Sequence, residues 1–210
     1  FVKIVSLDLG KRSILKSAAE LEDRHDPHDW RCLVKNALAV TGFRFGEEDG
    51  LDITISANLP KGSGMGTSSI LGAATVAALL GRNDPDEVAA LTLELEREMC
   101  TGGGWQDQYG GILGGVKLLR SKPGKVQNIT VKKVEIPKTA AKEFYERSLL
   151  YFTGQKRMAR NILRKVLAFY GANPHDFAKI LVRSLKADAE NCAKALEKGD
   201  LKLFARSVNN

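Results

Sequence analysis

The 210-residue chain is 43% apolar and 27% charged, which predicts a packed core and excludes extended disorder. Its longest apolar run, residues 70–80, is too short to cross a bilayer, which needs about 20 residues. The formal net charge is +7, but the basic residues are scattered, which favours solvated faces and a phosphate site over nucleic acid. Three widely separated cysteines predict free thiols in a reducing, cytoplasmic setting.

The first half of the chain alternates predicted strands and helices. Alternating apolar and polar residues predict strands over residues 1–7 and 51–58. Helical patterns and cap residues predict three helices, over residues 30–40 after Asp29, over 67–80, and from Pro85 to about Cys100 after Asp84. His25 and His28 stand in a polar turn, which we interpret as a solvated turn because no further ligand cluster accompanies them.

The second half becomes mainly helical. Strands are predicted over 116–119 and 126–136, and a short apolar strand over 149–152. Amphipathic patterns predict helices over 157–170, 177–196 and 201–208. The change from mixed to helical patterns predicts a boundary near Ser148.

A Gly-rich segment between a predicted strand and a predicted helix is typical of a phosphate site. Glycines let the backbone approach a ligand closely, and the first turn of a helix offers unpaired N–H groups and partial positive charge. The hydroxyls that follow can bind phosphate or Mg²⁺. The segment lacks the Walker A ending and the Rossmann glycine spacing, and a simple connector is the alternative. Its sequence is Pro60-Lys61-Gly62-Ser63-Gly64-Met65-Gly66-Thr67-Ser68-Ser69.

A second Gly-rich segment, residues 102–111, places Asp107 on a backbone with few side chains. Phosphoryl transfer to a hydroxyl needs a carboxylate to orient that hydroxyl and accept its proton, and another group to hold Mg²⁺. Asp107 suits the first task. Glu94, Glu96 and Glu98 are candidates for the second, and helical spacing does not choose among them. A turn or capping role for Asp107 is the alternative.

The two segments together resemble the GHMP kinases, the family of galactokinase, homoserine kinase and mevalonate kinase. The family's second motif reads Pro-x-x-x-Gly-Leu-Gly-Ser-Ser-Ala, and here Met65, Thr67 and Ser69 replace its Leu, first Ser and Ala. The resemblance implies that Ser68 and Glu96 bind Mg²⁺ and that Asp107 is the catalytic base. It also implies ATP as the nucleotide, bound by residues 61–69: Lys61, Gly62, Ser63, Gly64, Met65, Gly66, Thr67, Ser68 and Ser69.

Three longer strings resemble the L-fucokinase branch of that family: Ser63–Leu71, Thr101–Gln108 and Tyr151–Leu163. The resemblance implies an enzyme that converts L-fucose to L-fucose 1-phosphate. The heptose 7-phosphate kinases carry a similar Gln-Asp-Gln-Tyr string and are the alternative within the family. The implied sugar-binding residues are Gly104, Trp105, Asp107, Tyr109 and Arg157, with core packing as the alternative for the aromatics and a surface salt bridge for the arginine.

The implied fold is α+β, the GHMP-kinase fold with an N-terminal domain of the ribosomal-S5-domain-2 type. Residues 1–148 would form the ATP-binding domain without its N-terminal strand segment, and residues 149–210 the start of the C-terminal domain. The family's first and third motifs are not found, so we expect a fragment, and a non-catalytic nucleotide- or sugar-binding derivative is a third possibility. The sequence indicates no oligomeric state.

Overall fold

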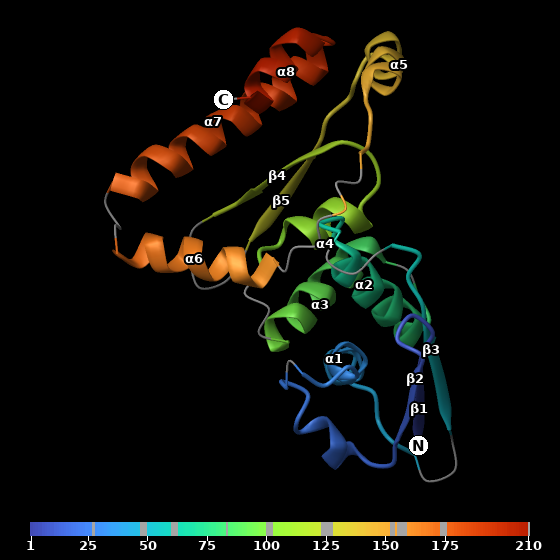
Figure 1. Cartoon of the computed structure of the whole chain (residues 1–210). Helices are drawn as coiled ribbons and strands as arrows, with labels where there is room; N and C mark the ends of the chain where they lie inside the picture. The colour runs from blue at the N-terminus through green and yellow to red at the C-terminus, as the bar shows by residue number, and fades with distance from the viewer. Residues whose placement is uncertain are drawn as a thin grey trace. The chain divides into compact units, whose positions relative to one another are not determined.

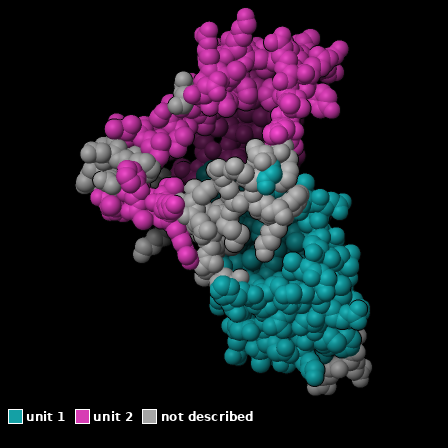
Figure 2. Space-filling model, in the orientation of Figure 1, with its two compact units in different colours: residues 1–113, 154–163 teal, residues 114–153, 164–210 magenta. Residues whose placement is uncertain are grey.

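The protein is represented by a computed structural model (Figure 1). It describes residues 1–26, 28–46, 50–59, 63–82, 84–99, 103–122, 128–151, 154, 159–172 and 176–209. The chain forms two compact units, coloured separately in Figure 2. Unit 1 comprises residues 1–113 with 154–163, and unit 2 comprises residues 114–153 with 164–210.

Unit 1 begins with a three-stranded sheet in the order β2-β1-β3. The central strand β1 (Val2–Ser6) pairs antiparallel with β2 (Lys11–Leu15) and parallel with β3 (Leu51–Ile55). Alternate residues of β1 are buried, as the apolar pattern of its sequence requires. They pack with helix α1 (Cys32–Val40) in one core cluster of Val2, Ile4, Leu15, Val34, Leu38 and Ile55.

Three further helices complete unit 1: α2 (Thr67–Leu80), α3 (Pro85–Glu98) and the short α4 (Gln106–Ile112). Helix α2 begins after Gly66 and ends before Gly81, and both glycines have left-handed φ angles near 65°. The Asp84 carboxylate caps α3 by accepting from the N–H groups of Asp86 and Glu87. A second core cluster joins α1, α2 and α3 through Ala37, Ala73, Val76, Val88 and Leu95.

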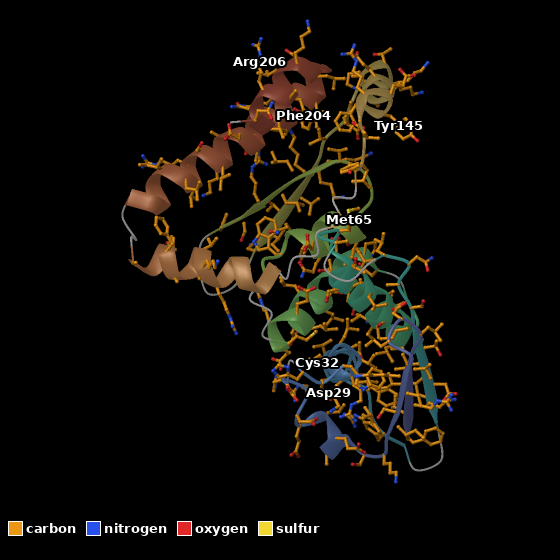
Figure 3. The ribbon with its side chains drawn as sticks, in the orientation of Figure 1. Asp29, Cys32, Met65, Tyr145, Phe204 and Arg206 are labelled. Atoms are coloured by element: carbon orange, nitrogen blue, oxygen red, sulfur yellow. The ribbon has the colours of Figure 1, made fainter. Side chains whose placement is uncertain are left out.

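Unit 2 contains an antiparallel hairpin, β4 (Lys117–Ser121) and β5 (Ile129–Lys133), with helices α5 (Lys138–Arg147), α7 (Asp176–Lys198) and α8 (Leu201–Asn209). Its core comprises Leu118, Val134, Ala193 and Leu196, with Phe204 packed against them. Phe204, which is labelled in Figure 3, also meets Phe144 of α5 edge to face, with ring centroids 5.6 Å apart. Helix α6 (Ala159–Ala172) has residues in both units.

Most predicted elements are found, and the misses have physical causes. The predicted apolar strand over 149–152 is wrong for its described part. Residues 149–151 are not a strand, and Leu149 and Leu150 are more than 80% exposed. Asp29 does not cap α1, which begins after Arg31 without a side-chain cap; its carboxylate instead accepts from the backbone and side chain of Arg31. Strand β2, helix α4 and helix α5 were not predicted.

The fold leaves the predicted position of the family-domain boundary untested. The predicted family-domain boundary near residue 148 stays a prediction, because the division into compact units describes packing within this chain and falls at residues 113–114 and 163–164. None of the helices in the described ranges combines the length and the apolar character that a membrane span requires.

Candidate functional site

The described part of the Gly-rich loop, residues 63–66, leads into the N-terminus of α2. Gly64 and Gly66 have φ angles of 79° and 65°, which side chains rarely tolerate, so glycine is required for this path. Gly66 cannot cap the helix with a side chain, and no side-chain cap is present. The loop therefore presents backbone to whatever lies at the start of α2. Pro60, Lys61 and Gly62 lie outside the described residues.

Two hydroxyls at this helix start are buried without a partner. Ser63 Oγ and Thr67 Oγ1 have no hydrogen-bond partner within the described part of the chain. A buried hydroxyl without a hydrogen bond is costly, so a native structure usually supplies a partner. A phosphate oxygen would supply one here, and the N–H groups of the first turn of α2 favour the same anion. Ser68, the predicted Mg²⁺ ligand, is exposed at this place.

Asp107 lies beside Gly66 although the two residues are far apart in sequence. A Cβ atom at Gly66 would lie 3.4 Å from Asp107 Cγ and 3.6 Å from its Oδ1. Asp107 is in the first turn of α4, and α4 approaches α2 closely because Gly111 leaves room for Ile70. The structure thus places an exposed carboxylate against the loop that suits phosphate, as the acceptance of a hydroxyl proton would need.

Glu96 faces the same helix from α3. Its Oε1 accepts a hydrogen bond from Ser69 Oγ at 2.5 Å, and both side chains are buried. Glu94 is exposed, and Glu98 is engaged elsewhere, by Arg24 and His25. Of the three candidate acids, the structure therefore brings only Glu96 to α2.

The pKa of Glu96 is raised above its ordinary value. Burial is the main cause, and the nearby charge of Asp107 raises the pKa further, while Ser69 and Gln108 act in the opposite direction. The groups that shift this pKa are a hydroxyl, an amide and a second carboxylate, all of which carry oxygen atoms of the kind that Mg²⁺ binds. No group of three or more His, Cys, Asp or Glu gathers among the described residues to hold a metal alone. Mg²⁺ fits such a donor set, because it commonly binds one or two protein groups together with nucleotide phosphates.

Gln108 is a site residue that the sequence analysis missed. It is completely buried, and neither its Oε1 nor its Nε2 makes a hydrogen bond of full geometry in the part of the chain that is described. It follows Asp107 on α4 and lies close enough to Glu96 to favour the ionised carboxylate. The repeated Gln in the Gln-Asp-Gln string was the available signal.

The predicted sugar-binding residues that the structure describes are exposed or half-buried. Gly104 and Asp107 are exposed, while Trp105 and Tyr109 are half-buried at the start of α4. Burial raises the pKa of the Tyr109 hydroxyl. Met65 is 48% exposed in the loop (Figure 3). Arg157 lies outside the described residues. The assignment of these residues to sugar binding stays a prediction.

A groove of about 700 Å³ runs along α2 beside this site, but its chemistry differs. It is lined mainly by apolar and small residues, including Ile70, Ala73, Ala77 and Ile112, with Arg82 as its charged member. The polar groups that converge on Gly66 do not line it. The lining of this groove therefore suits an apolar group better than a phosphate.

Comparison with known proteins identifies the family that the chain resembles in sequence. The model of the GHMP kinases N-terminal domain matches residues 32–115. The chain is 41% identical over 170 residues to the Arabidopsis thaliana bifunctional fucokinase/GDP-fucose pyrophosphorylase, over 78% of this chain and 16% of that protein. It is 33% identical over 224 residues to the Bacteroides fragilis L-fucokinase/L-fucose-1-P guanylyltransferase, over 97% of this chain and 23% of that protein.

A third curated relative and two solved structures also match the chain, and all three are kinases by name. A D-glycero-alpha-D-manno-heptose 7-phosphate kinase of Campylobacter jejuni is 31% identical over 71% of this chain and 44% of its own length. The chain therefore spans less than half of each of these three curated relatives. A mevalonate kinase crystal structure matches with a TM-score of 0.62 at 16% identity, over 98% of this chain and 64% of that one. The Methanococcus jannaschii mevalonate kinase matches with a TM-score of 0.58 at 17% identity, over 99% and 66%.

A Gly-rich loop that enters a helix, with acids from two other helices beside it, defines a domain of the small-molecule kinase class. The chain belongs to the GHMP kinase family. The predicted α+β GHMP-kinase fold is confirmed by the solved mevalonate kinases.

Proposed function

We propose that the protein phosphorylates a sugar with ATP, converting L-fucose to L-fucose 1-phosphate. The observation that carries this proposal is the position of Asp107 beside Gly66, which brings a carboxylate to the Gly-rich loop. The sugar is inferred from the two fucokinase relatives, which are 41% and 33% identical to the chain. The heptose 7-phosphate kinase relative supports the same reaction type with a different acceptor.

Each residue of the site has a distinct task in this proposal. The N–H groups at the start of α2, with Ser63 and Thr67, bind phosphate oxygens of ATP. Ser68 and Glu96 hold Mg²⁺, which neutralises phosphate charge when bound. Asp107 orients the sugar hydroxyl and accepts its proton. Most of the rate enhancement then comes from positioning and charge neutralisation.

The direct test is turnover by the complete protein with L-fucose, D-galactose and heptose 7-phosphate, followed by ADP release. We expect L-fucose to give the highest kcat/KM. Preference for heptose 7-phosphate would replace the proposed acceptor. ATP binding without any sugar-dependent turnover would support the non-catalytic derivative instead.

Asp107→Asn tests the site itself. Loss of the general base should lower sugar-dependent turnover by roughly 10²- to 10⁴-fold. ATP affinity should stay within about 2-fold of wild type, because the side chain is exposed beside the loop and is not part of it. Turnover at the wild-type rate would remove Asp107 from the catalytic role.

A further inference from the structure

Two side chains that the proposed function gives no task, Ser69 and Gln108, adjoin the carboxyl group of Glu96. Ser69 donates to Glu96 Oε1 at 2.5 Å from α2. Gln108 approaches from α4, and its amide favours the ionised form of the same carboxyl group. Glu96 itself is on α3, so three different helices meet at this carboxyl group.

The Ser69 hydroxyl has a specific orientation. Ser69 is only 2% exposed and faces α3, whereas its neighbour Ser68 is exposed at the same helix start. Ser69 therefore contacts the acid and not the solvent-facing phosphate site. It also stands where the resembled family motif has Ala, so its hydroxyl is an addition of this chain to that motif.

The Gln108 amide is poorly explained by a purely structural role. It is completely buried, and within the described residues neither of its amide atoms makes a full hydrogen bond. An apolar side chain of the same size would fill this space at lower cost to the fold. A functional role accounts for a polar group that the fold alone does not require.

We propose that Ser69 and Gln108 are positioning residues that hold the Glu96 carboxylate in the orientation that binds the divalent cation of the nucleotide. This inference rests on the proposed function only in that Glu96 binds a cation. Partners of a metal ligand commonly matter in this way, and their removal costs roughly 10- to 100-fold in metal affinity. The Ser69 hydrogen bond fixes one carboxylate oxygen and leaves the other for the cation.

The test measures Mn²⁺ binding by electron paramagnetic resonance, in the complete protein with a non-hydrolysable ATP analogue. Ser69→Ala should weaken Mn²⁺ binding about 10-fold. Gln108→Met should also weaken it, by at least about 3-fold, while its melting temperature stays equal or rises. That combination separates positioning from a structural role, which would lower stability first.

Thr75→Ala is the matched control, because it removes a buried hydroxyl of the same helix that bonds only the α2 backbone at Leu71. It should lower the melting temperature slightly and leave Mn²⁺ affinity unchanged. Wild-type Mn²⁺ affinity in both Ser69→Ala and Gln108→Met would overturn the inference, as would absence of Mn²⁺ binding in the wild type. Mn²⁺ binding without phosphorylation of any sugar would overturn the proposed function and leave this inference standing.

Discussion

Unit 1 contains two clusters that each surround one buried carboxylate side chain, the Asp29 cluster and the Glu96 cluster, and they differ in the charges around that carboxylate. In the first, Asp29 is 7% exposed and pairs with Arg31 at 2.9 Å and with the fully buried Lys35 at 2.8 Å. Asp23 pairs with the same lysine. In the second, the partners of Glu96 named above are a hydroxyl and an amide, and the charge that shifts its pKa is another carboxylate, Asp107.

The pKa shifts express this difference. Hydrogen bonds from Arg31 and Lys35 outweigh burial and hold the pKa of Asp29 well below its ordinary value, whereas burial raises that of Glu96. In the Asp29 cluster, whose Asp29 is labelled in Figure 3, Asp29 and Asp23 pair with basic side chains of the same chain, Arg31 and Lys35. In the Glu96 cluster, the groups that shift the pKa of the acid are a hydroxyl, an amide and a second carboxylate. We interpret the Asp29 cluster as structural and the Glu96 cluster as a candidate functional site.

The largest expected effect comes from replacing Lys35, the central cation of the Asp29 cluster. Lys35→Met would leave the Asp29 carboxylate buried beside one remaining partner, Arg31. Breaking a buried pair in this way costs about 3–5 kcal/mol. Urea unfolding of the variant should show a correspondingly lower midpoint.

Lys3→Met is the control for Lys35→Met, because the Lys3–Asp52 pair is 2.7 Å long but largely exposed. Its loss should cost about 0–1 kcal/mol. Equal destabilisation by the two substitutions would contradict the view that the Asp29 cluster is a buried structural unit.

The pH dependence of stability should differ in sign between the clusters. Asp29 has a lowered pKa, so its contribution is present above its ordinary value of 3.8 and is lost as the pH falls below it. Glu96 has a raised pKa, so its contribution is full below 4.5 and is lost as the pH rises through the folded-state pKa. Asp29→Asn should flatten the acid limb of the stability curve, and Glu96→Gln the upper limb.

Urea midpoints measured from pH 3 to pH 7.5 would check both slopes. Asp23 also has a lowered pKa, from its hydrogen bond to Lys35, so part of the acid limb should survive in Asp29→Asn. A rise of stability with pH that disappears in Glu96→Gln would contradict the assigned direction for Glu96.

The sequence analysis singled out residues of the Glu96 cluster but none of the charge pairs of the Asp29 cluster. The Gly-rich loop, α2 and the Asp84 cap are local signals, and all three are found where they were expected. Among Glu94, Glu96 and Glu98, spacing left the choice open, and burial against Ser69 distinguishes them. The Glu96 assignment had come from family resemblance, and its metal role stays a prediction.

The missed features depend on contacts between distant residues. Helix α4 was not predicted, because the glycines of residues 102–111 disfavour helices, yet α4 brings Asp107 to Gly66 and Gln108 toward Glu96. The sequence pattern did not single out Lys35, and only tertiary packing buries it between two aspartates. The periodicity of a sequence predicts which face of a helix is buried. It does not predict which charged residue from elsewhere in the chain will contact that face.

The smallest expected effect concerns the link between the two clusters. Arg24, from the loop that carries Asp23 and Asp29, donates to Glu98 at 3.1 Å, two residues beyond Glu96 on α3. Because this pair is about one-third exposed on both sides, Arg24→Met should cost about 1 kcal/mol or less. Mn²⁺ affinity should not change, since Glu98 and Glu96 point to different partners.

Urea unfolding and Mn²⁺ titration of Arg24→Met together decide whether the clusters are independent. Lys3→Met serves again as the exposed reference. A several-fold loss of Mn²⁺ affinity with little loss of stability would show that the structural cluster orients the cation site through Glu98. The expected small loss of stability with unchanged affinity would instead mean that α2 and α4 alone position Glu96, through the hydroxyl of Ser69 and the amide of Gln108.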